Sequence, residues 1–203
     1  MNRRAIKNGF VFVSIFFTSF ALILLAIGFF KGQVPELGLF LSIIVGASVV
    51  FPIIITSIGL LKGWLDYSVT TKNFNSYPFS NLIDIGFKKM IKNENSKWNL
   101  TSEFYNGMVN DFIVDCDVDT QNDYKSVRFI FYINHEPMDK AELNEFEQVL
   151  TKANGSMKFT TISKKFHYKN HGLKSISDLK VELANFVKII KSKNIMPSEV
   201  PWR

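Results

Sequence analysis

The chain has 203 residues, 47% of them hydrophobic and 21% charged, with a formal net charge of +6 at pH 7. Its single cysteine excludes a disulfide framework, and the sequence contains neither an internal repeat nor a low-complexity tract. The strongest signal is therefore the uneven distribution of apolar and charged residues along the chain.

Two uncharged apolar runs, residues 10–30 and 37–61, open the chain. A helix of residues 10–30 would be about 30 Å long at ~1.5 Å per residue, which matches the hydrocarbon core of a bilayer. The Gly- and Pro-containing residues 31–36 predict a tight turn, so residues 1–63 are expected to form a transmembrane hairpin. A cleaved signal peptide is the alternative for the first run, but the run exceeds the usual ~7–15 residues and no small-residue cleavage site follows.

Basic residues flank the hairpin unevenly. The turn has Lys31 alone, whereas several Lys and Arg residues precede the first run or follow the second: Arg3, Arg4, Lys7, Lys62, Lys72, Lys88 and Lys89. The positive-inside rule then predicts a multi-pass protein of the cell inner (cytoplasmic) membrane with both termini in the cytoplasm. The lipid bilayer is the first expected partner.

Neither run contains an ionisable side chain, which argues against a transporter or a channel. Gly38, Ser42 and Gly46 are spaced by four and would let another helix approach closely. This face could pack the two helices of the hairpin together, or it could serve self-association or a protein partner. Pro52 lacks a backbone N–H and is expected to bend the second helix near Ser48.

Residues 64–78 are polar and turn-rich, and they predict a flexible linker to a cytoplasmic domain over residues 79–203. Residues 79–86 predict a short helix closed by Gly86, followed by an edge strand from Phe87. Asn106-Gly107 predicts a two-residue hairpin turn between strands over residues 98–105 and 108–119. Further strands are predicted over residues 123–134 and, as one strand, over residues 156–168.

Two long helices complete the domain. The first covers residues 137–155, with Asp139 as N-cap, Glu142 closing a capping box, and Asn154 or Gly155 ending it in a left-handed conformation. The second covers residues 177–193 and has an apolar face of Leu179, Leu183, Phe186, Val187 and Ile190. The order α-β-β-β-β-α-β-α predicts a membrane-anchored α+β fold with a small antiparallel sheet.

Aspartates alternate with the only cysteine in the strand over residues 108–119. If Asp119 pairs with Tyr124, Cys116 faces the core and Asp115 lies opposite Arg128, so an Asp115–Arg128 cross-strand ion pair is expected on a solvated face. Metal binding is the alternative. Alternate carboxylates on one strand stand about 6–7 Å apart and would need ligands from elsewhere.

Other signs of catalysis are few. His135, His167, His171 and Cys116 are suitable zinc ligands by type, but the spacing of His167 and His171 would suit zinc only on a helix, and they follow a strand. The sequence has neither a glycine-rich phosphate loop nor a nucleophile elbow. We therefore predict no catalytic residue, no metal and no cofactor.

The charge of the soluble part is bipolar, acidic over residues 94–147 and basic over residues 148–203. Lys164, Lys165, Lys188 and Lys191 are candidate contacts for anionic lipid headgroups. The bipolar charge could also serve self-association or a protein partner, while nucleic acid is unlikely because exposed aromatic residues are few. The leading hypothesis is a non-enzymatic, membrane-anchored interaction or regulatory domain. The alternative is a ligand- or metal-binding or catalytic domain that uses the acidic strand and the histidines.

Overall fold

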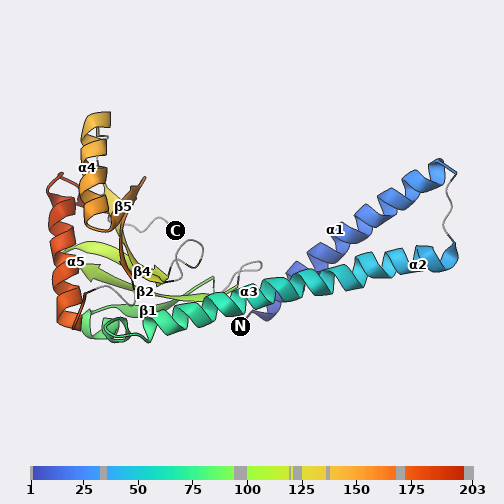
Figure 1. The fold of residues 1–203 in the computed structure, drawn as a ribbon, viewed down its shortest axis with the longest axis horizontal. Coiled ribbons are helices and arrows are strands. Elements are labelled where there is room, and N and C mark those ends of the chain that lie inside the picture. Colours follow the sequence, from blue (N-terminus) through green and yellow to red (C-terminus); the bar gives the residue numbers. More distant parts are fainter. Residues whose placement is uncertain are drawn as a thin grey trace. The chain divides into compact units, whose positions relative to one another are not determined.

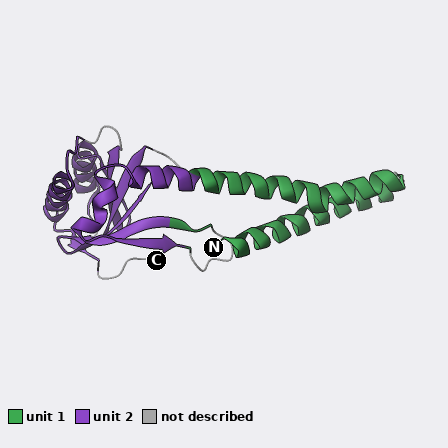
Figure 2. Cartoon of the chain, turned by 90° about the horizontal axis from the view of Figure 1, so that it is seen from below, with its two compact units in different colours: residues 1–65, 93–102 green, residues 66–92, 103–203 purple. Residues whose placement is uncertain are grey.

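The computed structural model describes residues 2–32, 36–93, 100–118, 120, 125–135, 138–167 and 172–198. The chain divides into two compact units, Met1–Leu65 with Asn93–Ser102, and Asp66–Lys92 with Glu103–Arg203 (Figure 2). The predicted pairing of Asp119 with Tyr124 and the position of His171 lie outside the described residues.

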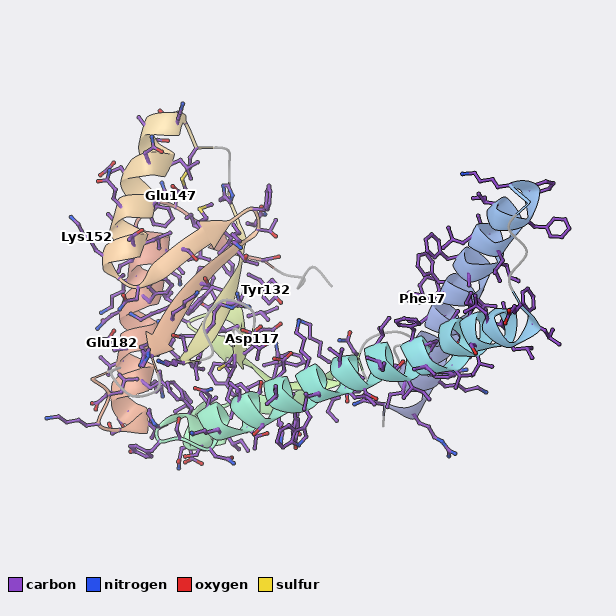
Figure 3. All side chains as sticks on the ribbon, turned by 45° about the vertical axis from the view of Figure 1, so that its right-hand side comes forward. Phe17, Asp117, Tyr132, Glu147, Lys152 and Glu182 are labelled. Carbon is purple, nitrogen blue, oxygen red and sulfur yellow. The ribbon has the colours of Figure 1, made fainter. Side chains whose placement is uncertain are left out.

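The first unit is built from helices: α1 (Arg3–Phe30), α2 (Leu37–Val45), the π-helical η1 (Gly46–Val50) and the first part of α3 (Phe51–Phe74), as drawn in Figure 1. The segments Arg3–Phe30 and Leu37–Phe74 are each long and apolar enough to cross a membrane. Large apolar side chains are exposed along both; they include Phe12, Ile15, Phe16, Ile23, Ile53 and Ile58. Figure 3 shows side chains projecting outward along these helices.

Helix α1 packs against the second apolar segment through rings and small residues. The rings of Phe17 and Phe51 stack with their centroids 5.6 Å apart. Ala21 and Ala47 are both buried, because a methyl side chain lets helix backbones approach closely.

The π-helical turn η1 lies where Pro52 was expected to bend the second helix; the bend itself stays a prediction. The N–H of Phe51 donates to the carbonyl of Gly46, five residues back instead of four. Pro52 cannot donate a backbone hydrogen bond, and its ring crowds the carbonyl of Ser48, so a wider turn relieves the helix there. The Ser48 hydroxyl donates to the Ile44 carbonyl at 2.7 Å.

The prediction of a flexible linker over residues 64–78 is wrong, because α3 is helical through Phe74. Thr70, Asn73 and Phe74 are buried, and the Phe74 ring lies 4.9 Å from the ring of Tyr105 in an edge-to-face contact. Packing of this last part of the helix in the second unit therefore outweighs the polar, β-branched composition that suggested a linker.

A short segment of the first unit is fixed to its helices. The backbone N–H and the hydroxyl of Thr101 both donate to the side-chain oxygen of Asn2, at 2.9 Å each. Leu100 lies against Gly63, where any larger residue would collide with the leucine side chain. Residues 100–101 are thus held to α1 and α3 at the same time.

The second unit is an α+β fold, which confirms the predicted class. Its sheet contains β1 (Lys88–Lys92), β2 (Ser102–Val109), β3 (Phe112–Val118), β4 (Ser126–Asn134), β5 (Gly155–Lys158), β6 (Thr161–His167) and β7 (Met196–Pro197). The strand order is β1-β2-β3-β4-β6-β5, with β7 paired to β4. Strands β2 to β6 pair antiparallel with their neighbours.

Three helical segments cover one face of this sheet: the 3₁₀ helix η2 (Phe79–Ile85), α4 (Lys140–Lys152) and α5 (Ile176–Lys191). The predicted apolar face of α5 is buried in full, from Leu179 to Ile190. The capping box of Asp139 and Glu142 is formed, and Asn154 takes the left-handed conformation after α4, with φ 56°. Gly86 closes η2, as expected, with φ 94°.

Residues 156–168, predicted to be one strand, form a hairpin of β5 and β6 that turns at Phe159 and Thr160. Phe159 adopts φ 44° and is 92% exposed. This turn contains no Gly, Asn or Asp, the residues by which a turn is usually recognised, and the sequence pattern therefore predicted one continuous strand.

The hairpin turn predicted at Asn106-Gly107 is also wrong, because both residues lie inside β2. The chain turns instead at Asn110 and Asp111, with φ 45° and 75°. Gly107 serves packing: a Cβ there would stand 2.8 Å from Cγ of Phe87, a side chain that is 1% exposed. The strong local preference of Asn-Gly for a turn is overridden by this contact.

Candidate functional site

The predicted Asp115–Arg128 pair is incorrect, because the register differs by two residues from the expected one. Arg128 lies opposite Asp117, and Asp115 lies opposite Ile130. A two-residue shift keeps every side chain on its predicted face, so Cys116 still faces the core, where it now meets Phe129. The shift follows from a connection between β3 and β4 that is longer than the one assumed, since the last pair of the ladder is Val118 with Val127.

The acidic strand carries a network of cross-strand hydrogen bonds. Asp115 accepts from the amide of Asn106 at 2.8 Å and from the hydroxyl of Tyr132 at 2.6 Å. Asp117 accepts from Nε and Nη2 of Arg128 at 3.0 and 3.1 Å. Every carboxylate oxygen of the two aspartates therefore has a protein donor, and the network joins β2, β3 and β4 on the outer face of the sheet.

The cysteine between these aspartates is completely buried. Burial raises the pKa of the Cys116 thiol well above its ordinary value, and the nearby carboxylates of Asp117 and Asp115 raise that pKa further. A neutral thiol in the core behaves as a small apolar side chain.

The histidines and carboxylates do not converge. Nε2 of His135 lies 3.1 Å from the carbonyl oxygen of Phe159, and His167 is at the other end of β6. Across the described residues, no group of three or more His, Cys, Asp or Glu side chains is arranged to hold a metal ion.

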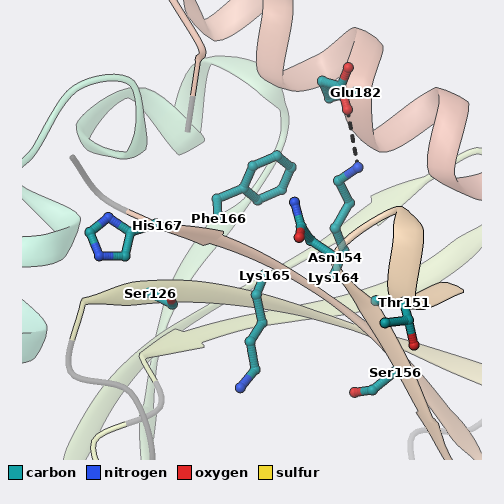
Figure 4. A pocket seen from close by; sticks show the side chains of 10 residues that line it. Ser126, Thr151, Asn154, Ser156, Lys164, Lys165, Phe166, His167 and Glu182 are labelled. Carbon is teal, nitrogen blue, oxygen red and sulfur yellow. Dashed lines mark hydrogen bonds and ion pairs between the residues drawn. The ribbon is translucent and has the colours of Figure 1, made fainter. Parts of the chain in front are cut away.

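A pocket of about 720 Å³ lies beside the C-terminal end of β6, next to the start of β5. Figure 4 shows its lining, which comes from β6, the start of β4, the end of α4, the start of β5 and one side chain of α5. Its residues are Ser126, Thr151, Asn154, Gly155, Ser156, Lys164, Lys165, Phe166, His167 and Glu182.

The pocket contains a buried lysine. Lys164 is 7% exposed and points to the helix-covered face of the sheet, with Ile162 and Phe166. Its Nζ donates to Oε2 of Glu182 at 3.0 Å and lies 5.2 and 5.1 Å from the ring centres of Phe166 and Phe186. One carboxylate and two aromatic faces thus hold the ammonium group in place.

A glycine makes room for one of these rings. A Cβ on Gly155 would stand 2.7 Å from Cζ of Phe186. We expected Lys164 to be exposed, which is wrong. The sequence does contain a signal for its burial, because Lys164 lies two residues from both Ile162 and Phe166 and so shares their face of β6.

The four lysines proposed for lipid contact do not form one surface. Lys165 alternates with the buried Lys164 along β6 and points away from it in Figure 4. Lys188 contacts Asn185 at 3.4 Å, and Lys191 pairs with Asp111 at 3.6 Å. Headgroup contact by Lys165, Lys188 and Lys191 stays a prediction, while Lys164 is buried and does not lie on the exposed surface.

The small residues of the second apolar segment leave an open face. Gly38 and Ser42 are exposed, and a Cβ added to Gly38 or Gly46 would meet nothing within 4 Å. The Ser42 hydroxyl donates to the Gly38 carbonyl at 2.8 Å. The described part of the hairpin therefore packs through other residues than this stripe.

No protein-family model, curated protein or solved structure matches this chain.

Proposed function

We propose that this chain is an integral protein of the inner membrane whose α+β unit is a non-enzymatic interaction or regulatory domain in the cytoplasm. The observation that carries the proposal is the pair of helical segments, Arg3–Phe30 and Leu37–Phe74, which are long and apolar enough to cross a membrane. Their large apolar side chains are exposed, and lipid would cover them.

The distribution of basic residues supports the orientation. Arg3, Arg4 and Lys7 lie at the start of α1, and Lys62 and Lys72 lie in α3 beyond the apolar run. Both ends of the hairpin then belong on the cytoplasmic side. A non-enzymatic role is supported by the aspartates of β3, whose carboxylate oxygens bind neighbouring strands.

The open stripe of Gly38, Ser42 and Gly46 supports self-association within the bilayer. Small residues spaced by four allow a second helix to approach until backbone atoms are in van der Waals contact. Because the described helices of the hairpin do not use this face, a second copy of the chain can occupy it without repacking the first.

Two measurements test the anchor. The protein should stay with the membrane fraction after alkaline carbonate washing, which removes peripheral proteins. A reporter enzyme that is active only after export should be silent when fused after Arg203. Release by carbonate would refute the anchor, and an active reporter would refute the orientation.

Self-association is tested by energy transfer between labelled copies in proteoliposomes. Gly38→Leu and Gly46→Leu should abolish the transfer, since a large side chain on the stripe keeps a second helix away. A Cβ added at either glycine meets nothing within 4 Å in one chain, so the loss would not come from a clash at that atom. Gly59→Leu is the matched control, because Gly59 is equally unobstructed but lies outside the stripe. Equal transfer in all variants would remove the stripe from the proposal.

A further inference from the structure

We propose that the pocket at the end of β6 is a binding site for a small anionic ligand, whose carboxylate or phosphate oxygens replace Glu182 as the partner of Lys164. This assigns to the second unit a ligand-binding role that is independent of membrane anchoring. The site differs from the one considered from the sequence, since it uses neither the acidic strand nor a metal.

The first argument is the cost of the buried ammonium group. A lysine that is 7% exposed needs a negative partner and hydrogen-bond acceptors, because desolvation of an unpaired charge is expensive. The Lys164 ammonium has three N–H donors, of which one is directed to Glu182 at 3.0 Å. The rings of Phe166 and Phe186 hold its position, so the cation is already in place before a ligand arrives.

The second argument is the asymmetry of the ion pair. The side chain of Lys164 is 9% exposed, whereas that of Glu182 is 47% exposed. Glu182 can therefore turn into solvent at little cost, while Lys164 cannot leave the pocket. An incoming anion would replace Glu182 as the partner of the Lys164 ammonium group, and water would then solvate the Glu182 carboxylate.

The third argument is the size and polarity of the surroundings. A pocket of about 720 Å³ lies within the range of sites for small molecules, about 300–1,000 Å³. Among the described residues that line it, Glu182 is the only acidic one, and the amide of Asn154 is also part of the lining. A lining with one displaceable carboxylate beside Lys164 favours an anion, and the Asn154 amide can bond the rest of a polar molecule.

The test uses the full-length protein in a neutral detergent, with sodium pyrophosphate and sodium citrate as probes and sodium chloride of equal ionic strength as the control. Glu182→Gln removes the internal competitor and should tighten probe binding by between about 5-fold and 150-fold, the usual range for coupled sites. Lys164→Met keeps the length and apolar stem of the side chain and should abolish binding. Lys193→Met removes a lysine from another ion pair, with Glu145, and should bind as wild type does.

A stability measurement separates binding from misfolding. Glu182→Gln leaves Lys164 without its partner and should lower the midpoint of thermal unfolding, and the probes should restore it. The double variant Lys164→Met, Glu182→Gln should unfold at a temperature that the probes do not change. Because Glu182 is half exposed, Glu182→Gln is expected to fold even if Lys164→Met does not.

Soluble anions and lipid headgroups present the same oxygens, so a second arm uses nanodiscs. Rescue of Glu182→Gln by phosphatidate nanodiscs, but by neither soluble probe, would assign the site to a lipid headgroup; rescue by a soluble probe would assign it to a free anion. If no anion binds the wild type or rescues Glu182→Gln, or if Glu182→Gln does not bind the probes more tightly than wild type, the proposal is refuted.

Discussion

The register of β3 against β4 makes a quantitative prediction about Asp117 and Arg128. Two parallel charge-assisted bonds of 3.0 and 3.1 Å join them, and their side chains are only 23% and 27% exposed. Exposed ion pairs contribute about 0.2–1 kcal/mol, and a bidentate, half-buried pair belongs at the top of that range. We expect a coupling free energy of about 1 kcal/mol in a double-mutant cycle of Asp117→Asn and Arg128→Gln.

The same experiment with Asp115 is the matched control. Asp115 bonds to Asn106 and Tyr132 instead of Arg128, so Asp115→Asn should be destabilising by itself yet additive with Arg128→Gln, within about 0.3–0.5 kcal/mol. Both cycles concern adjacent carboxylates on one face of one strand. The comparison therefore isolates which of them is the partner of the guanidinium group.

The chain supplies its own probe for the assay. Cys116 is the only cysteine and is completely buried, so a thiol reagent reaches it only when the sheet opens. The amount of labelling against urea concentration then gives the free energy of unfolding of the second unit within the detergent-solubilised protein. Strong coupling of Arg128 to Asp115, with additivity at Asp117, would refute the register.

Three further results are expected. Phe159→Asn should stabilise the second unit by about 0.5–1 kcal/mol, because Asn tolerates the left-handed conformation that exposed Phe159 adopts; an unchanged or lower urea midpoint would contradict this. Gly107→Ala should destabilise the unit by about 1–3 kcal/mol by collision with Phe87, while Gly59→Ala should leave that unit unchanged in the same urea titration. Burial raises the pKa of the Cys116 thiol in the folded protein. The stability of the second unit should therefore not depend on this thiol below about pH 8.5, the pKa of an unfolded thiol, and should fall as the pH rises above that value. A Cys116→Ala variant with the same alkaline dependence would show that another group is responsible.

Features set by alternation or by a few adjacent residues could be predicted from the sequence. Alternation placed Cys116 in the core, and the spacing of Leu179 to Ile190 identified the buried face of α5. The cap of α4 at Asp139 was predictable because its partners lie within three residues. In each case the interaction is local, so neighbouring residues contain all the information needed.

Features that depend on distant contacts could not be predicted in this way. The partner of Arg128 depends on the length of the connection between β3 and β4, which alternation does not report. Gly107 faces Phe87 across the sheet, and the last turns of α3 are held by contacts such as that of Phe74 with Tyr105. The pocket was missed for the same reason, since Lys164 and Glu182 come from different elements.

The π-helical turn at Gly46–Val50 limits the length over which another helix can stay in contact with one face of the second apolar segment. Successive side chains of an α-helix are rotated by about 100° around the helix axis. A π-helical turn holds more residues than an α-helical turn, so it rotates all the side chains that follow it relative to those before it. The stripe of Gly38, Ser42 and Gly46 keeps its phase only as far as Gly46, where the π-helical turn begins, about 15 Å from Leu37 at ~1.5 Å per residue. That is about half of the ~30 Å hydrocarbon thickness, so a helix lying along this stripe would part from it near the middle of the bilayer.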